Sequence, residues 1–446
     1  MLLHCLKDSP LNLAFITPSA KSVLRADLLE WAESPLVRDW RLKHSGVNVG
    51  ICSSDNFYIG LSLLVLDGYA KRIILFPVGL DKDGLFDLAR KAECSTIISD
   101  KIEFSLQGIG LADPLPPFQS GLQGKNAPNV TAACSTQWVL STSGTTKTPK
   151  LVAHSLDTLS KSVKKDANKG SDLCWGLLYD LNRFAGIQVF LQSLIGGSSL
   201  ALPSADTTLE NKLAFFEQVG CNAISATPTL WRKILMTPGS QKLQLKFITL
   251  GGEIADQSIL SALKKAYPFA RITHIYASTE AGVGFSVSDG LEGFPAHYLD
   301  GTLTSVKLRI SEDGILEIKP VIIGQKYLNE SIHLTNDDGF LSTGDRVQLR
   351  DDRVFFLGRD SGAINVGGNK VQPEKIEQTL LGHPEIAMAS VIPKRSGITG
   401  SLVEARIVLK AEVNSTISIP LLRQWCMDRL DRHEVPAIFK ILKDIG

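Results

Sequence analysis

Short apolar runs alternate with segments of helical period over the first 300 residues. Short, largely apolar runs occupy 73–76, 96–98, 223–226 and 246–250. Segments 85–92 and 230–235 lie between or after them and have the spacing of amphipathic helices. Continuous apolar strands separated by helices are typical of largely parallel sheets in α/β layers. The pattern therefore predicts an α/β fold over this part of the chain.

The pattern changes near residue 300, where apolar and polar side chains alternate one by one. Alternation covers 306–310, 315–318 and 353–357, with the turn signals Asp313-Gly314 and Asp338-Gly339 between the runs. It predicts an antiparallel β subdomain over about 302–357.

A third pattern begins after residues 358–362. We expect helices near 373–381 and 419–429 and strands near 387–392 and 404–410. The fold class is thus α/β, with a large N-terminal domain of layered sheets and helices (1–358) and a small α+β C-terminal domain (359–446). Segment 115–128, rich in Pro, Gly and Ser, is the expected long loop.

Composition excludes several classes of protein. The 446 residues carry 47 Lys and Arg against 46 Asp and Glu, so no excess of positive charge favours nucleic acid as a partner. The most apolar stretch, 58–70, is interrupted by Asp67 and is too short for a membrane span, which needs about 20 residues. Seven scattered cysteines without a CxxC pair, and a start that makes a poor signal peptide, predict reduced thiols and a cytoplasmic location.

One segment has the composition of a phosphate-binding loop. Residues 141–150 read Ser-Thr-Ser-Gly-Thr-Thr-Lys-Thr-Pro-Lys directly after an apolar run, and they contain six hydroxyl side chains and one glycine. Such a loop offers donors and close backbone approach to a polyphosphate. Its spacing is not that of a Walker A loop, and on composition alone a surface Ser/Thr turn is an equal interpretation.

Three further segments suit a nucleotide and its metal ion. Residues 276–280 read Tyr-Ala-Ser-Thr-Glu, where a carboxylate beside a hydroxyl can hold magnesium. Asp345, in Thr-Gly-Asp, can accept the hydroxyl groups of a ribose, and Arg359 offers a planar cation. Taken singly, each residue is better explained without a nucleotide: Glu280 as a solvated helix start, Asp345 as part of a turn and Arg359 as part of a surface linker.

Taken together and in order, these segments resemble those of the acyl-adenylate-forming superfamily, which includes acyl-CoA and aryl-CoA synthetases. The hydroxyl-rich loop 141–150, the segment 276–280 and Thr343-Gly344-Asp345 match three of its motifs. Gly358 to Ile364 matches its hinge stretch, and 365–371, followed by Pro373 and Glu377, matches its glycine-rich loop. The resemblance covers nearly the whole chain.

The resemblance implies a role for each matching residue. The ATP phosphates would be held by Thr142, Ser143, Gly144, Thr145, Thr146 and Lys150. The adenine would lie between Gly251, Gly252, Glu253 and Tyr276, and the ribose would bind Asp345 and Arg359. Thr279 would contact the α-phosphate and Glu280 would hold Mg2+. The acyl pocket would be lined by Tyr179, Phe184, Gly186, Thr227 and Gly282.

The family also implies a moving C-terminal domain. It would swing about a hinge near 360–361 and bring the loop with Gly368 and Lys370 into the site, where that loop shapes a channel for a pantetheine thiol.

The chain departs from the family pattern at several positions. Lys147 and Leu151 replace glycines, Ala277 replaces another, and Ser361 stands where the hinge Asp or Lys is expected, so that Asp360 is a candidate substitute. The family's closing Thr-x-x-Gly-Lys loop has no counterpart before Gly446, and Lys440 and Lys443 are poor replacements for its lysine. Either the tail is missing from this form of the chain or adenylation proceeds without that lysine.

The resemblance implies an ATP-dependent carboxylic acid–thiol ligase. It would make an acyl-AMP from an aryl or fatty acid and release pyrophosphate. The acyl group would then pass to coenzyme A or to the phosphopantetheine of an acyl carrier protein. An amino acid is less expected, because no aspartate is clearly placed to hold its ammonium group. The alternative is a non-catalytic or adenylation-impaired nucleotide-binding homologue. His154 is expected to be a structural residue.

Overall fold

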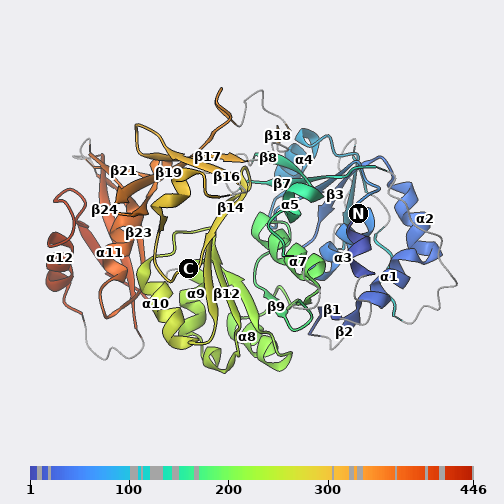
Figure 1. The fold of residues 1–446 in the computed structure, drawn as a ribbon, viewed down its shortest axis with the longest axis horizontal. Helices are drawn as coiled ribbons and strands as arrows, with labels where there is room; N and C mark the ends of the chain where they lie inside the picture. The colour runs from blue at the N-terminus through green and yellow to red at the C-terminus, as the bar shows by residue number, and fades with distance from the viewer. Residues whose placement is uncertain are drawn as a thin grey trace.

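The computed structural model describes residues 1–7, 13–18, 22–100, 109–111, 114–120, 134–142, 150–164, 170–303, 306–320, 326–328, 335–366, 369–396, 400–410 and 417–443. These ranges form four sheets with helices packed against them (Figure 1). None of the helices in these ranges has the length and apolar composition needed to cross a membrane.

The largest sheet has the strand order β14-β13-β12-β11-β9-β10-β1-β2. Its strands are β1 (Leu13–Ile16), β2 (Ser22–Leu24), β9 (Cys174–Leu177), β10 (Ser199–Ala201), β11 (Ala223–Ala226), β12 (Phe247–Gly251), β13 (Arg271–Ser278) and β14 (Gly282–Val287). Only the two edge strands, β2 and β14, run antiparallel to their neighbours. Its outer face packs against α8 (Leu209–Gln218), α9 (Pro228–Met236) and α10 (Gln257–Ala266).

The second sheet has the order β18-β8-β7-β4-β3-β5-β6. Its strands are β3 (Asn48–Cys52), β4 (Arg72–Leu75), β5 (Thr96–Ser99), β6 (Gly110–Leu111), β7 (Gln137–Ser141), β8 (Leu151–Ser155) and β18 (Lys326–Tyr327). Strands β7 and β8 pair antiparallel on either side of segment 142–150. One face of the sheet packs against α4 (Lys82–Lys91).

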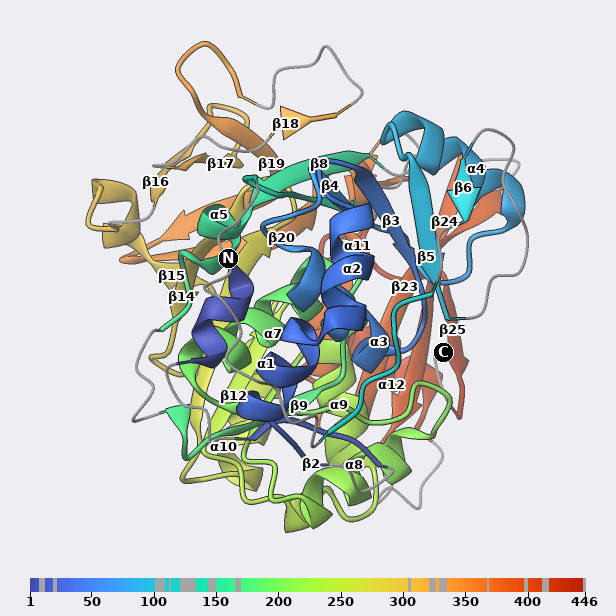
Figure 2. The same ribbon diagram turned by 90° about the vertical axis from the view of Figure 1, so that its right-hand side faces the viewer.

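Helices α3 (Asn56–Leu66) and α7 (Phe184–Gly196) share one apolar core with strands of both sheets (Figure 2). The same core includes α1 (Arg25–Glu33) and α2 (Pro35–Lys43). Helix α3 begins where the Asp55 carboxylate accepts the Phe57 amide at 2.8 Å and ends before Gly68, whose φ is +88°. The apolar stretch noted in the sequence is therefore a buried helix between two sheets.

The third sheet is antiparallel, with the order β15-β20-β19-β17-β16. Its strands are β15 (Phe294–Pro295), β16 (Val306–Ile310), β17 (Ile315–Pro320), β19 (Leu341–Arg350) and β20 (Arg353–Arg359). Alternation predicted this sheet but not its short strand β15, because two residues contain no readable period.

The fourth sheet lies at the end of the molecule away from α1 and α2 (Figure 1). Its strands are β21 (Ile364–Val366), β22 (Asn369–Val371), β23 (Ile386–Ser396), β24 (Gly400–Leu409) and β25 (Ile438–Ile441). Helices α11 (Pro373–Leu381) and α12 (Ile419–Met427) complete an apolar core made only of residues 364–439. The predicted α/β fold with a further small α+β unit is confirmed.

Candidate nucleotide and acyl site

The turn after β12 places Gly251, Gly252 and Glu253 beside the start of α9. Gly252 has φ +83°, which favours glycine, and the Glu253 carboxylate accepts the Thr229 amide at 2.9 Å. A carboxylate at a helix N-terminus satisfies an otherwise unpaired amide. Glu253 therefore has a structural contact in addition to its predicted place beside adenine.

Tyr276, on β13, lies in an aromatic group. Its ring is nearly parallel to those of Phe285 and Phe356, with both centroids 5.2 Å away. Its hydroxyl donates to the Asp345 carboxylate. Burial and the negative charge of Asp345 raise the pKa of Tyr276 well above its usual value, so the hydroxyl keeps its proton.

Asp345 and Arg359 face each other across β19 and β20. Arg359 Nε lies 3.0 Å from Asp345 Oδ1, while Oδ2 accepts from Tyr276. The Asp345 amide donates to the Thr343 hydroxyl at 3.1 Å, which fixes the turn of Thr-Gly-Asp. Both carboxylate oxygens thus have partners that two ribose hydroxyl groups could replace.

These side chains line one cavity of about 670 Å3 between the large sheets and the fourth sheet. Glu253, Tyr276, Asp345 and Arg359 are on its wall, together with a buried ion pair between Arg232 and Asp256. The fourth-sheet unit contributes residues of α11 and β23 to the other wall. Five sequence-predicted residues, Gly252 included, are therefore brought together from four separate segments.

Glu377 of α11 is the most perturbed carboxyl on this wall. Burial, with the nearby charges of Glu374 and Glu253, raises its pKa to about 7, although the Val391 amide and Arg232 act in the opposite direction. The Val391 amide donates to Glu377 Oε1 at 2.7 Å.

The segment 358–362, before α11, contacts strands of both the third and the fourth sheet. Asp360 accepts from Arg346 of β19 at 2.9 Å and lies 3.5 Å from Lys370 Nζ of β22. Gly358 has φ +128°, and a Cβ there would lie 2.4 Å from a carboxylate oxygen of Glu374. Gly368 lies outside the described residues.

Thr279 and Glu280 are at the tip of the hairpin formed by β13 and β14. The Ser278 hydroxyl accepts the Ala281 amide at 2.9 Å, and Gly282 has φ +72°, so the turn is held by its own residues. Within the described part of the chain, Glu280 has no ion pair or hydrogen bond.

Only the ends of the predicted phosphate loop are described. Thr142 is buried, and its amide donates to the Lys150 carbonyl at 2.8 Å, which closes the base of the loop. Ser143, Gly144, Thr145 and Thr146 lie outside the described residues.

Among the predicted acyl-pocket residues, two have evident structural uses. The Thr227 hydroxyl accepts the Leu230 amide at 3.2 Å as the cap of α9, and a Cβ on Gly186 would lie 2.1 Å from the Asp180 carbonyl oxygen. The Tyr179 hydroxyl is buried, and burial raises its pKa, although the Ser225 side chain acts in the opposite direction. Phe184 begins α7 and packs against His154, with ring centroids 5.8 Å apart.

Sequence reasoning missed the partners that complete this site. Phe356 and the Arg232–Asp256 pair lie in none of the matched motifs, and their sequence positions carry no signal that they meet at the cavity. His154 was expected to be structural. Burial lowers its pKa to about 4, and the neighbouring Thr279 backbone opposes that shift.

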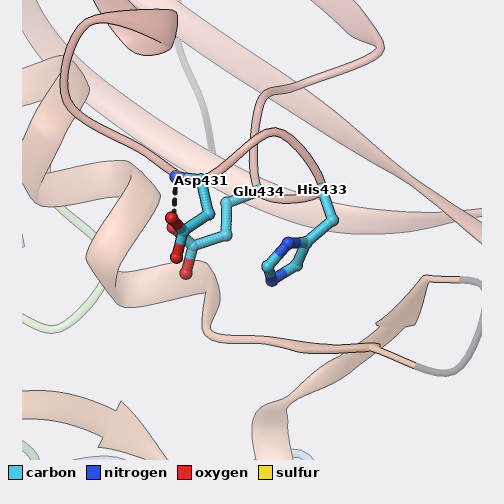
Figure 3. A group of neighbouring side chains, drawn as sticks. All are labelled: Asp431, His433 and Glu434. Carbon is cyan, nitrogen blue, oxygen red and sulfur yellow. Dashed lines mark hydrogen bonds between the residues drawn. The ribbon is translucent and has the colours of Figure 1, made fainter.

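Among the residues that the structure describes, one other group of side chains could hold a metal ion. Asp431, His433 and Glu434 each present a ligand atom within 4.8 Å of the others (Figure 3). The Lys375 ammonium lies 2.6 Å from a Glu434 carboxylate oxygen, and the Asp431 amide donates to that carboxylate at 3.0 Å. A lysine already neutralises the acid, so this group makes a poor cation site.

Residues 62–312, more than half of the chain, match the family model described as AMP-binding enzyme. The chain is 27% identical over 297 residues to 4-coumarate–CoA ligase 2 of Narcissus pseudonarcissus; the match covers 60% of this chain and 52% of that one. It is 26% identical over 338 residues to 2-succinylbenzoate–CoA ligase of Salmonella typhimurium, covering 71% and 69%. The chain thus spans about half the length of the first relative.

The fold is similar to that of o-succinylbenzoate CoA synthetase from Bacillus subtilis. The structure of that enzyme with its acyl-adenylate intermediate has a TM-score of 0.75 at 19% identity, covering 100% of this chain and 94% of that one. A second structure of the enzyme, with ATP and magnesium ion, has a TM-score of 0.73 at 19% identity, covering 100% and 96%.

Proposed function

Because the chain belongs to the AMP-binding enzyme family, we propose that it is an ATP-dependent acid–thiol ligase. It activates a carboxylic acid, aryl or fatty, as an acyl-adenylate and then forms a thioester. The relatives support this reaction class, since 4-coumarate–CoA ligase and 2-succinylbenzoate–CoA ligase both join a carboxylic acid to coenzyme A.

The observation that carries the proposal is the shared cavity. Tyr276, Asp345 and Arg359 belong to three different strands, yet their side chains bond to one another on one wall. Aromatic, carboxylate and guanidinium groups are what a nucleoside monophosphate needs for its base, its ribose and its charge. Gly251, Gly252 and Glu253 form the neighbouring turn, where the adenine would lie.

The phosphate end of the nucleotide would lie toward Thr142 and Lys150, where the loop between β7 and β8 closes. Glu280 fits Mg2+, because its carboxylate offers hard oxygen ligands and has no competing partner in the described ranges. Thr279 beside it would contact the α-phosphate. When bound, the ion supplies charge neutralisation between two anions. Lys150 and the hydroxyl groups hold the phosphates for in-line attack.

The reaction balances in two steps. A carboxylate oxygen bonds to the α-phosphorus while the bond to pyrophosphate breaks, which gives the mixed anhydride acyl-AMP. A thiol sulfur then bonds to the acyl carbon, the bond to AMP breaks, and the thiol proton is released. Tyr179, Phe184, Gly186, Thr227 and Gly282 would surround the acyl group.

The thiol would belong to coenzyme A or to the phosphopantetheine of a carrier protein, and Gly368 and Lys370 would lie on its channel. We place the division of the chain at 358/359 with the hinge near 360–361. The ion pairs of Asp360 with Arg346 and Lys370 support this position, because they join the third sheet to the fourth.

Pyrophosphate release with hydroxylamine trapping tests the proposal. Hydroxylamine takes the place of the thiol, so the assay measures adenylation with aryl, short, medium and long acids without knowledge of the acceptor. We expect a hydroxamate with one class of acid and loss of product in Lys150→Ala. ATP binding by calorimetry without any hydroxamate would instead establish the nucleotide-binding alternative.

A further inference from the structure

The Glu374 carboxylate, in the first turn of α11, lies against the end of β20 with one oxygen unpaired. A Cβ on Gly358 would lie 2.4 Å from Glu374 Oε2, and the Arg359 amide nitrogen is 3.5 Å from Oε1. Oε2 is not reached by solvent and has no hydrogen-bond partner in the described ranges. Within those ranges, the carboxylate is thus joined to β20 by one hydrogen bond at the upper limit of length.

A second oxygen without a donor faces the same glycine. Gln372 Oε1 would lie 3.1 Å from a Cβ on Gly358, and it too is buried without a partner in the part of the chain that the structure describes. Both oxygens are acceptors, so neither can satisfy the other. Burial of a carboxylate oxygen and an amide oxygen without donors raises the free energy of this arrangement.

The two oxygens belong to the fourth-sheet unit, whereas the strand that they face belongs to the third sheet. Helix α11 packs in the apolar core made of residues 364–439, and β20 packs in the core of the third sheet. The unfavourable contact therefore exists only while the two units keep this arrangement. A rotation about segment 358–362 that draws α11 away from β20 would expose both oxygens to water and leave both cores intact.

We propose that Gln372 and Glu374 are positioning residues, whose unpaired oxygens destabilise the observed arrangement and so favour release of the fourth-sheet unit from β20. The inference rests on the proposed function, in which that unit swings between the two half-reactions. Other contacts oppose release, since Asp360 accepts from Arg346 at 2.9 Å and lies 3.5 Å from Lys370 Nζ. The swing needs such a balance, because slow opening of a tightly held arrangement would limit turnover.

Glu374→Gln supplies the missing donor. The new side chain keeps the shape of the old one and an oxygen for the Arg359 amide, and its N–H group faces Gln372 Oε1. We expect the observed arrangement to be stabilised, so that hydrogen–deuterium exchange of peptides containing Arg359 slows about 10-fold in the ligand-free full chain. A damaged fold would exchange faster, so slower exchange does not arise from misfolding.

Gly358→Ala acts in the opposite direction. Its Cβ would overlap Glu374 Oε2, and a φ of +128° strains any residue with a side chain, so we expect faster exchange. Gln372→Leu removes the second acceptor and should slow exchange. Asp428→Asn is the matched control, because this exposed carboxylate just after α12 accepts from Gln424 at 2.7 Å, and exchange near Arg359 should stay unchanged.

Two exchange results would overturn the proposal. One is an unchanged rate in Glu374→Gln. The other is faster exchange in Gln372→Leu, since the Gln372 amide would then be turned so that its N–H group holds the Glu374 carboxylate in place.

The two half-reactions test whether release serves the reaction. Hydroxamate formation measures adenylation, and thioester formation from preformed acyl-AMP and coenzyme A measures the second step. Because each step needs its own arrangement of the fourth-sheet unit, Glu374→Gln should slow one step about 10-fold and leave the other unchanged or faster. Equal loss of both rates would refute a positioning role.

Failure of the proposed function gives a different result. If the unmodified chain forms no hydroxamate with any acid, the ligase assignment is wrong, and exchange alone decides the role of the two oxygens. Slower exchange in Glu374→Gln with faster exchange in Gly358→Ala supports release by unpaired oxygens. Shifts of the same sign in these two variants refute it.

Discussion

Arg25 is a buried cation held by backbone carbonyl groups. Its guanidinium donates to the carbonyls of Cys5, Ser193, Leu194 and Ser198 at 2.9–3.2 Å, and the side chain is 1% exposed. Two of these carbonyls end α7, where the helix dipole favours positive charge. One side chain thus joins the N-terminal segment to the helix that begins with Phe184.

We expect Arg25→Met to lower the free energy of unfolding by about 3 kcal/mol or more, because several buried carbonyls lose a charged donor. Urea denaturation followed by circular dichroism measures the change. Arg90→Met is the control: Arg90 is 70% exposed and pairs with Asp87 on its own helix, so a change within about 0.5 kcal/mol is expected. Equal urea midpoints for Arg25→Met and Arg90→Met would contradict the structural role of Arg25.

Asp345 is the residue on which the ribose assignment depends. Asp345→Asn keeps the shape of the side chain but removes the charge that Arg359 and Tyr276 contact. Since a hydrogen bond to a charged group contributes about 1.5–3 kcal/mol, we expect ATP to bind roughly 10- to 100-fold more weakly. Calorimetric titration with ATP measures this. Asp352→Asn, on the exposed turn of the same sheet, should bind ATP normally, and normal binding by Asp345→Asn would remove Asp345 from the ribose site.

At the scale of elements, α7 and the segment before it approach closely. A Cβ on Gly186 would lie 2.1 Å from the Asp180 carbonyl oxygen, which is backbone and cannot move as a side chain can. We expect Gly186→Ala to destabilise the protein by about 1–3 kcal/mol through strain at the start of the helix. A Cβ added at Gly382 would lie 3.4 Å from its nearest neighbour, the Thr379 carbonyl oxygen, and φ there is −70°. Gly382→Ala should therefore leave the melting temperature nearly unchanged. Equal melting temperatures for Gly186→Ala and Gly382→Ala would show that segment 180–186 shifts to accept the added Cβ without strain.

Local patterns predicted the elements more completely than the site. Helix α11 was expected at 373–381 and spans Pro373–Leu381, because Pro373 marks its start and the apolar period marks its face. The aromatic neighbours of Tyr276 come from β14 and β20, and no local pattern indicates which distant strands meet. The role of Thr227 is not readable from a local pattern either. Its hydroxyl caps α9, which becomes evident only when the start of that helix is known.

At the scale of the whole molecule, the fourth sheet meets the large sheets across a wall rich in acids. Glu374 and Glu377 of α11 face Glu253 of the large domain, with Arg232 as the nearby cation. Like charges that meet in a poorly solvated place favour uptake of a proton. The contact between the two parts of the chain is therefore linked to pH.

The linkage has a definite sign. The pKa of Glu377 is raised from its ordinary 4.5 to about 7, so between these values the folded chain binds more protons than the unfolded chain. The stability contributed by this group therefore falls by up to about 3 kcal/mol as pH rises from about 4.5 to 7. Above pH 7 it stays at that lower value. Glu377→Gln keeps an oxygen that can accept the Val391 amide and removes the charge.

We expect the melting temperatures of Glu377→Gln and the unmodified chain to coincide near pH 4 and to separate in favour of the variant by pH 8. Differential scanning calorimetry at pH 4, 6 and 8 measures the separation. Glu217→Gln, on an exposed position of α8, should follow the unmodified chain at every pH. A separation that is constant with pH would mean that Glu377 does not titrate in this range. A separation at pH 8 in favour of the unmodified chain would reverse the sign and show that the charged form of Glu377, near Arg232, is what holds the two parts together.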